Sequence, residues 1–274
     1  MIAEHIDWLV VKRGESPLVV SVPHAGVELA EFGPAFADPW LARKDADWRL
    51  DELYDFVGPL GATVVRTQLS RSIIDVNRDP SGASLYPGQA TTELVPTTTF
   101  DGEPLYPAGQ SPDAAEIARR RRLYFDPYHA ALSAEIARLR RKHNRVALFD
   151  AHSIRSRIPR LFDGELPVFN LGTNSGRSCS LALREAVEAV LASSGASCVT
   201  DGRFKGGWIT RAFGAPSDGV EALQMELACR GYMAEPERPT AENWPTPIDA
   251  ERAGPTRATL KRVLETILSK AGGS

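Results

Sequence analysis

The sequence predicts an α/β fold with a mixed, largely parallel central sheet flanked by helices. Short apolar runs alternate along the chain with longer segments whose apolar residues recur at helical spacing, which is the pattern of strands joined by helices. The composition, 43% hydrophobic and 24% charged over 274 residues, is typical of a globular protein. No internal repeat and no linker divides the chain. We therefore expect a single domain over residues 1–274.

The predicted strands are short runs rich in apolar and β-branched residues. The run LVVSV at 18–22 is almost wholly apolar, as expected of a strand that is covered on both faces, and it stops at Pro23. The full set of predicted strands is 18–22, 62–67, 72–76, 145–150, 166–171, 197–200 and 220–227.

Amphipathic segments predict the helices, which lie at 38–57, from 112 or 113 to 142, at 181–193 and at 253–270. Gly58-Pro59 ends the first of them, and Pro127 should kink or divide the second. The stretch 79–112 is rich in Pro, Gly and Thr and is predicted to be a loop. A loop of this length inside a compact domain is usually functional or disordered.

Charge and cysteine content exclude several classes of protein. The formal net charge is −3 and the isoelectric point is about 6.0, which argues against a nucleic-acid or membrane-surface binder. The first eleven residues lack the basic start and apolar run of a signal peptide, and no run of 18 apolar residues is present. We therefore expect a cytoplasmic protein with 3 reduced cysteines, while the 5 histidines leave room for a His-based metal site.

Polar residues able to do chemistry stand where the predicted strands end. His24, the pair Asp150 and His152, and Glu226 each lie at or near the end of a different predicted strand. Ligands of open α/β sheets bind at the carboxyl ends of the strands. A single histidine in such a place is more often structural, but two placed in this way favour a shared metal, and neutral imidazole is a common zinc ligand.

A catalytic zinc needs three protein ligands and one open position, so a third ligand must be found. The spacing of the chain does not choose among the nearby acidic residues, which are Glu28, Asp45, Asp47 and Asp51.

Glu226 has two interpretations, because it lies between Met225 and Leu227. It is either a strand-end carboxylate facing solvent or a desolvated general base with a raised pKa. Beside a metal, Asn77 and Arg78 would form a clamp for a substrate carboxylate. No phosphate-binding loop, dinucleotide fingerprint, HExxH helix or GxSxG elbow competes with this interpretation.

A series of motifs runs through the chain in a fixed order. They are SVPHAG (21–26), DADWRLDELYDF (45–56), SRSIIDVNRDP (70–80), SLYPGQATTELVPTTTFDGEPLY (84–106), DAHSIRSRIPRLFDGELP (150–167), GTNSGRSC (172–179), GGWITRAFG (206–214) and QMELACRGYM (224–233). Together the set resembles the N-formylglutamate amidohydrolase (N-formylglutamate deformylase) family, which is related to the zinc carboxypeptidase and aspartoacylase-like hydrolases. The resemblance covers residues 18 to 233.

The resemblance implies a zinc carboxypeptidase-like α/β domain that binds one Zn²⁺ per chain. By position in the motifs, His24 and His152 would be the imidazole ligands, and Asp47 rather than Glu28 would be the acidic ligand. Two further acidic residues would orient a ligand, namely Asp45 and Asp51.

The resemblance also implies the catalytic and substrate-binding residues. Glu226 matches the general base, and Arg71 matches the position of a carbonyl-polarising arginine. Asn77 and Arg78 match the pair that holds a substrate carboxylate, and Arg211 is a candidate for the second carboxylate of a glutamate substrate.

The implied activity is the zinc-dependent hydrolysis of N-formyl-L-glutamate to formate and L-glutamate, a step of histidine degradation. The expected partner is a small acidic N-acyl amino acid, with no nucleic acid and no membrane. Two alternatives remain open. The first is an amidohydrolase acting on other N-formyl or N-acyl amino acids, and the second is a metal-free protein that binds acidic ligands without chemistry.

Overall fold

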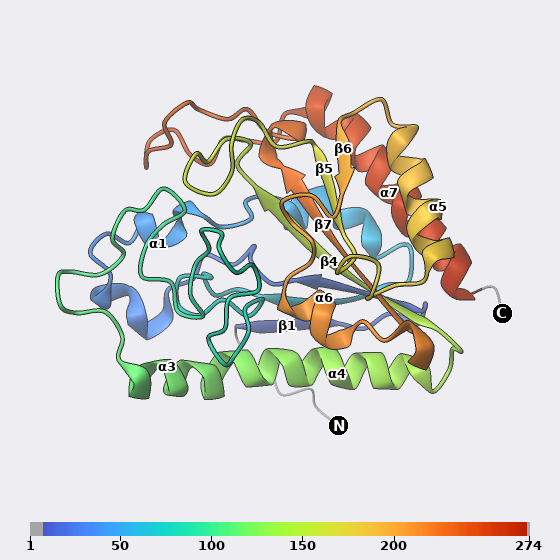
Figure 1. Ribbon diagram of the computed structural model, residues 1–274, viewed down its shortest axis with the longest axis horizontal. Coiled ribbons are helices and arrows are strands. Elements are labelled where there is room, and N and C mark those ends of the chain that lie inside the picture. The colour runs from blue at the N-terminus through green and yellow to red at the C-terminus, as the bar shows by residue number, and fades with distance from the viewer. Residues whose placement is uncertain (1–7, 273–274) are drawn as a thin grey trace.

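Within residues 8–272, which the computed structural model describes, seven strands form one sheet in the order β1-β3-β2-β4-β7-β5-β6 (Figure 1). Their bounds are β1 Leu9–Lys12, β2 Leu18–Val22, β3 Thr63–Thr67, β4 Val146–Ile154, β5 Phe169–Gly172, β6 Cys198–Thr200 and β7 Val220–Ala228. Neighbours pair in parallel except at β1–β3 and β5–β7, which are antiparallel. The predicted fold class, a mixed and largely parallel sheet flanked by helices, is therefore confirmed.

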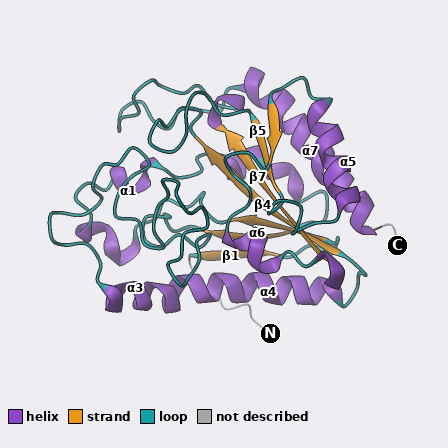
Figure 2. Cartoon of the chain, viewed as in Figure 1, coloured by secondary structure: helices purple, strands orange, loops and turns teal. Residues whose placement is uncertain are grey.

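Helices cover both faces of this sheet (Figure 2). The α-helices are α1 Leu41–Lys44, α2 Leu50–Leu53, α3 Ala114–Arg120, α4 Asp126–Arg140, α5 Leu181–Ala192, α6 Trp208–Phe213 and α7 Ala250–Gly272. Short 3-10 helices lie at Ala30–Ala35, Asp55–Val57, Pro216–Asp218 and Cys229–Gly231, and a π-helical turn at Arg121–Phe125 joins α3 to α4. Helix α4 runs along one side of the sheet, whereas α5 and α7 pack together on the other (Figure 1).

The two faces of the sheet have separate apolar cores, and β2 contributes to both. Leu18 and Val20 pack in the core that contains Leu260 of α7, while Val19, between them, packs in the core that contains Leu132 of α4. All five residues are fully buried. Burial on both faces explains why β2 is an almost uninterrupted apolar run rather than an alternating one.

Two predicted elements are wrong. Residues 72–76 form turns rather than a strand, and the side chain of Asp75 accepts a hydrogen bond from the backbone N–H of Asn77 there. The segment 38–57 is not one helix but the short pieces α1, α2 and Asp55–Val57. Arg49 interrupts it with a left-handed backbone, at φ 61°. This conformation does not occur inside a right-handed helix.

The long helical segment before β4 is confirmed, with its division at a different place from the one predicted. The chain leaves regular α-helix at Arg121–Phe125, before Pro127, and Pro127 lies in the first turn of α4. Proline is tolerated there because its missing N–H has no partner to lose at a helix start, and the π-helical turn absorbs the change of register.

The stretch 79–112 contains neither helix nor strand, as predicted, and lies over the carboxyl ends of the central strands. No helix in the described part of the chain is long and apolar enough to cross a bilayer. The prediction about the amino-terminal segment falls mostly outside the described residues.

Candidate metal centre and active site

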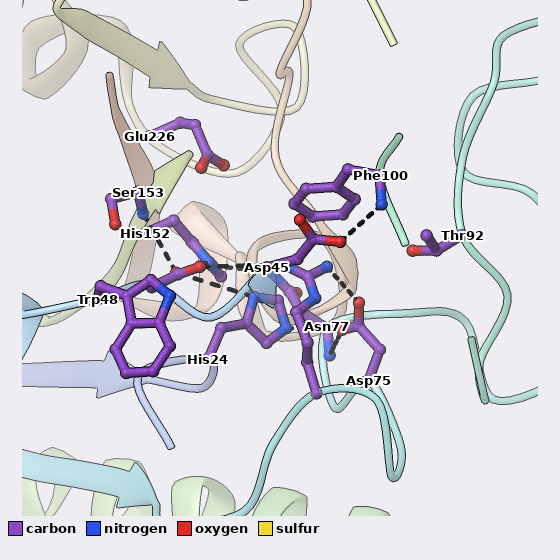
Figure 3. Close-up of polar contacts among 12 residues, drawn as sticks. His24, Asp45, Trp48, Asp75, Asn77, Thr92, Phe100, His152, Ser153 and Glu226 are labelled. Atoms are coloured by element: carbon purple, nitrogen blue, oxygen red, sulfur yellow. Dashed lines mark hydrogen bonds and ion pairs between the residues drawn. The ribbon is translucent and has the colours of Figure 1, made fainter. Parts of the chain in front are cut away.

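Three predicted metal ligands come together at the carboxyl ends of the central strands. His24 lies two residues beyond β2, His152 lies inside β4, and Asp47 lies between α1 and α2. Their ligand atoms are all within 4.8 Å of one another, and all three side chains are buried. Strand β4 continues past the predicted end at 150, so His152 is a strand residue rather than a loop residue (Figure 3).

The geometry favours Asp47 over Glu28 as the acidic member of this cluster. The backbone N–H of Asp47 donates to the carbonyl oxygen of His24 at 2.9 Å, and its Oδ2 accepts from the N–H of Ser153 at 3.1 Å. These bonds attach the α1–α2 turn to both histidine-bearing segments. Glu28 is exposed to solvent.

Two carboxylates set the orientation of the imidazole rings. Nε2 of His24 is 2.7 Å from Asp75 Oδ1, and Nε2 of His152 is 2.9 Å from Asp150 Oδ2, so each ring can donate its Nε2–H to a carboxylate. The Nδ1 atoms then face Asp47, at 3.9 Å for His24 and 3.2 Å for His152. Metal-binding histidines almost always donate their second nitrogen to such a group.

Unsatisfied buried atoms also fit a cation at this cluster. His24 Nδ1 and Asp47 Oδ1 are buried and have no hydrogen-bond partner among the described residues. A buried polar atom without a partner costs free energy unless a ligand satisfies it. Two imidazole nitrogens and one carboxylate form a common ligand set for catalytic zinc, so the residues present fit that metal.

The charges around the cluster prepare the ligands differently. Burial lowers the pKa of His24, and the positive charge of Arg71 lowers it further, which keeps the ring neutral. Burial also lowers the pKa of His152, but Asp150 and Asp47 outweigh it and raise the value well above the ordinary one. A cation binding at His152 Nδ1 would therefore displace a proton.

The orienting acids predicted from the sequence were the wrong ones. Asp45 accepts from the N–H of Phe100 at 2.6 Å, and Asp51 pairs with Arg66 at the surface. Among the described residues, neither of these acids bonds to His24, Asp47 or His152. Asp75 and Asp150 orient the two rings instead. Position supplied a signal for Asp150, which is two residues before His152 and therefore faces the same side of the strand.

Glu226 lies on β7, the strand next to the one that carries His152. It pairs with His152 in the parallel register of β7 and β4, and its side chain is buried (Figure 3). Burial raises the pKa of Glu226 to about 7, although the nearby His152 works in the opposite direction. Its Oε2 accepts a hydrogen bond from Gln224 Nε2 at 3.2 Å. Glu226 is thus a desolvated carboxyl, not a solvent-facing strand end.

His24, His152 and Glu226 line one solvent-open cavity of about 540 Å³, whereas Asp47 is not among its lining residues. His152, Gln224 and Glu226 come from the strands and His24 from the loop after β2, and the loop 79–112 covers them with Tyr86, Thr92 and Phe100. Three arginines reach the same cavity, namely Arg71, Arg78 and Arg203. The long loop therefore has a place in the site, as its length suggested.

Arg71, which was predicted to polarise the substrate carbonyl, and two of the predicted substrate-binding residues, Asn77 and Arg78, are held by internal contacts. Arg71 pairs with Asp75 at 2.6 Å and lies over the ring of Phe100, and Arg78 donates to the carbonyl and hydroxyl oxygens of Thr92. Asn77 donates from Nδ2 to Asp150 at 3.0 Å. All three side chains line the cavity.

Arg211 occupies a different place from the other predicted residues. It is not among the residues that line the cavity; its Nε donates to the carbonyl oxygen of Gly206 at 2.9 Å and its guanidinium packs 5.1 Å from the ring centre of Tyr86. Arg203, to which the sequence analysis gave no role, reaches the cavity beside the same ring. The sequence that follows Arg203, RFKGGWITR at 203–211, mixes basic and aromatic residues but does not indicate that Arg203 faces a cavity.

Comparison with known proteins places the chain in a family. The N-formylglutamate amidohydrolase family model matches residues 16–233. The N-formylglutamate deformylases of Pseudomonas aeruginosa and Pseudomonas putida are 44% and 43% identical to the chain, over 96% and 94% of it and 97% and 94% of their own lengths.

Solved structures agree with these matches. The N-formylglutamate amidohydrolase from Ralstonia eutropha JMP134 superposes with a TM-score of 0.78 at 25% identity, over 97% of this chain and 98% of that one. A gene product of Agrobacterium tumefaciens shares the fold, with a TM-score of 0.68 at 18% identity over 95% and 96% of the two chains. The chain therefore belongs to the N-formylglutamate amidohydrolase family.

Proposed function

We propose that the protein hydrolyses N-formyl-L-glutamate to formate and L-glutamate with one zinc ion per chain. The main support is that the His24, Asp47 and His152 cluster presents both histidines to a cavity that is also lined by the Glu226 carboxyl and by a group of arginines. The names of the Pseudomonas relatives support the same substrate. Membership of this family supports a role for the reaction in histidine degradation.

His24, Asp47 and His152 would hold the metal, through both Nδ1 atoms and a carboxylate oxygen. When bound, zinc polarises a carbonyl oxygen and lowers the pKa of a coordinated water towards about 7. Asp75 and Asp150 keep the ring nitrogens turned towards it. The remaining polar residues of the cavity then act on water and substrate.

Glu226 is the proposed general base. With a pKa of about 7, its carboxyl is substantially ionised at neutral pH and can accept a proton at an Oε atom from the attacking water. The same oxygen then returns the proton to the glutamate nitrogen as the amide bond breaks. A base of this kind contributes roughly 10²- to 10⁴-fold in rate.

Three further residues are proposed to stabilise developing charge or to position the substrate, namely Arg71, Asn77 and Arg78. Arg71 is held rigidly by Asp75 and can stabilise negative charge that develops on the formyl oxygen. Arg78 and Asn77 would hold a substrate carboxylate and so fix the amide for attack. Glutamate has a second carboxylate, which calls for a further cation; Arg203 and Arg211 both pack against Tyr86.

The convergence of these residues also supports the proposal of a single domain. Residues as distant in the chain as His24 and Glu226 line one cavity, so separating the chain between them would divide the site.

A comparison of substrates tests the proposed reaction. We expect the zinc-loaded protein to release formate from N-formyl-L-glutamate with a higher kcat/KM than from N-formyl-L-methionine, and to cleave N-acetyl-L-aspartate poorly. Preference for either of the other substrates would assign a different N-acyl amino acid. No cleavage of any substrate, with binding of the acidic ones retained, would make the protein an acidic-ligand binder.

A further inference from the structure

Arg203 differs from the other arginines of the cavity because it has no acidic partner. Arg71 and Arg78 both lie within 3.6 Å of the Asp75 carboxylate, which offsets part of their charge. Among the described residues, no carboxylate is paired with Arg203 within 4.0 Å, although the side chain is partly buried and lines the cavity. The positive charge of an unpaired arginine that lines a cavity can be offset by an anionic ligand.

Neutral groups hold the Arg203 guanidinium in place. Its Nε donates to the carbonyl oxygen of Leu161 and its Nη2 to that of Ala90, both at 2.8 Å. Its Cζ lies 5.4 Å from the ring centre of Tyr86 and 5.2 Å from that of Phe204. These contacts fix the orientation without neutralising the charge, and no hydrogen bond to Nη1 exists within the described part of the chain. A fixed guanidinium with a free N–H edge suits a carboxylate.

The electrostatic surroundings agree with this geometry. Burial lowers the pKa of Arg203, Tyr86 opposes that change, the like charge of Arg78 lowers the value again, and the charge of Glu226, which is not paired with Arg203, raises it least. An arginine nevertheless stays protonated in proteins. The guanidinium groups of Arg78 and Arg203 thus face one cavity and repel each other, and a ligand with two carboxylates would relieve the repulsion at both.

We propose that Arg203 binds the side-chain carboxylate of the substrate and selects for N-formyl dicarboxylic amino acids. The assignment rests on the proposed function and adds to it the origin of the preference for an acidic side chain. Arg78, which contacts Asp75 beside the metal cluster, takes the α-carboxylate. Arg211 supports the ring of Tyr86 from outside the cavity lining.

Binding to a variant that does not turn over tests the proposal directly. The probes are N-formyl-L-glutamate and N-formyl-L-glutamine, which have the same shape and differ in side-chain charge, titrated calorimetrically into zinc-loaded Glu226→Gln protein. We expect tighter binding of N-formyl-L-glutamate. Adding Arg203→Met should reduce that preference by about 10- to 100-fold, which corresponds to the loss of one hydrogen bond between charged groups. The affinity for N-formyl-L-glutamine should change little. Arg203→Lys, which keeps the charge, should restore part of the preference.

The control and the contrary outcomes separate the two proposals. Arg177→Met removes an exposed arginine that does not line the cavity and should leave the preference unchanged. The assignment of Arg203 is overturned if its variants keep the preference, if Arg211→Met alone abolishes it, or if the unaltered site has none. Absence of formate release with Glu226 intact would instead contradict hydrolysis, while a preference that depends on Arg203 would still stand.

Discussion

Each histidine of the cluster has one ring nitrogen bonded to a carboxylate and the other turned towards Asp47. The carboxylate fixes the ring and makes the opposite nitrogen a better ligand. At the scale of the residue, we therefore expect metal binding to depend on Asp75 and Asp150 as well as on the three proposed ligands.

Replacing Asp150 by Asn should weaken zinc binding by roughly 10- to 100-fold, because the amide holds the Nε2–H of His152 less strongly. Competition with a chromogenic chelator measures the change. Asp51→Asn is the matched control, since Asp51 pairs with Arg66 at the surface. Equal zinc affinity in the two variants would show that Asp150 does not support the site.

Replacing Glu226 by Gln keeps the shape and the hydrogen-bonding capacity of the side chain but removes the base. We expect turnover to fall roughly 10²- to 10⁴-fold while the zinc content stays the same, since Glu226 is outside the ligand cluster. Formate release and metal analysis of the same sample measure both quantities. Full activity in this variant would exclude Glu226 as the base.

The pH profile should report the same carboxyl. Burial raises the pKa of Glu226 from 4.5 to about 7, so the base is protonated and inactive below that value, and kcat/KM should fall as the pH falls. Bound zinc adds positive charge and moves this limb to lower pH. The limb should be missing from the residual activity of Glu226→Gln over the range where zinc stays bound. An identical limb in both proteins would assign it to another group.

The sequence could identify part of this site and not the rest. His24, His152 and Glu226 were found because they stand at or near the ends of predicted strands, where a local pattern is visible. Asp75 was missed because it lies in a segment that looks like a strand, and its role depends on a contact with a residue 51 positions away. Arg203 was missed because only the folded chain shows that it faces a cavity.

At the scale of the element, β4 and β7 fix the relation between metal cluster and base. Their parallel register sets His152 opposite Glu226, and both strands are buried along almost their whole length. Apolar runs predicted these strands well. The α1–α2 segment was mispredicted as one helix because its apolar spacing is helical. The left-handed backbone of Arg49 interrupts it, and no feature of the sequence marks Arg49 as left-handed.

The start of α6 supports the site through a close backbone approach. A Cβ at Gly207 would lie 2.4 Å from Asn77 Nδ2, the atom that donates to Asp150. Gly207→Ala should therefore displace Asn77, lower the free energy of unfolding by about 1–3 kcal/mol and reduce kcat/KM. Thermal unfolding and formate release measure these effects.

The control for that substitution is Gly58→Ala, since a Cβ at Gly58 meets nothing within 4 Å. It should change stability by no more than about 0.5 kcal/mol and leave activity intact. If Gly207→Ala behaved in the same way, the contact with Asn77 would have no importance for catalysis.

At the scale of the whole molecule, one sheet brings distant parts of the chain to a single cavity. The first histidine follows β2, the proposed acidic ligand comes from the turn after α1, and the proposed base lies on β7, near the end of the family match. The loop 79–112 covers this edge of the sheet and adds Tyr86 and Phe100 to the cavity. The arrangement explains why the motifs are spread so widely, yet the sequence alone did not show how the loop closes over them.

We propose that a single zinc ion at the His24, Asp47 and His152 cluster supports hydrolysis of N-formyl-L-glutamate. Formate release from this substrate, measured while zinc is returned stepwise to chelated protein, tests it most directly. We expect activity to be lost on chelation, to rise in proportion to added zinc, and to level off at one equivalent per chain. Full activity in the metal-free protein, or no formate release at any zinc level, would exclude zinc-dependent hydrolysis of N-formyl-L-glutamate by this protein.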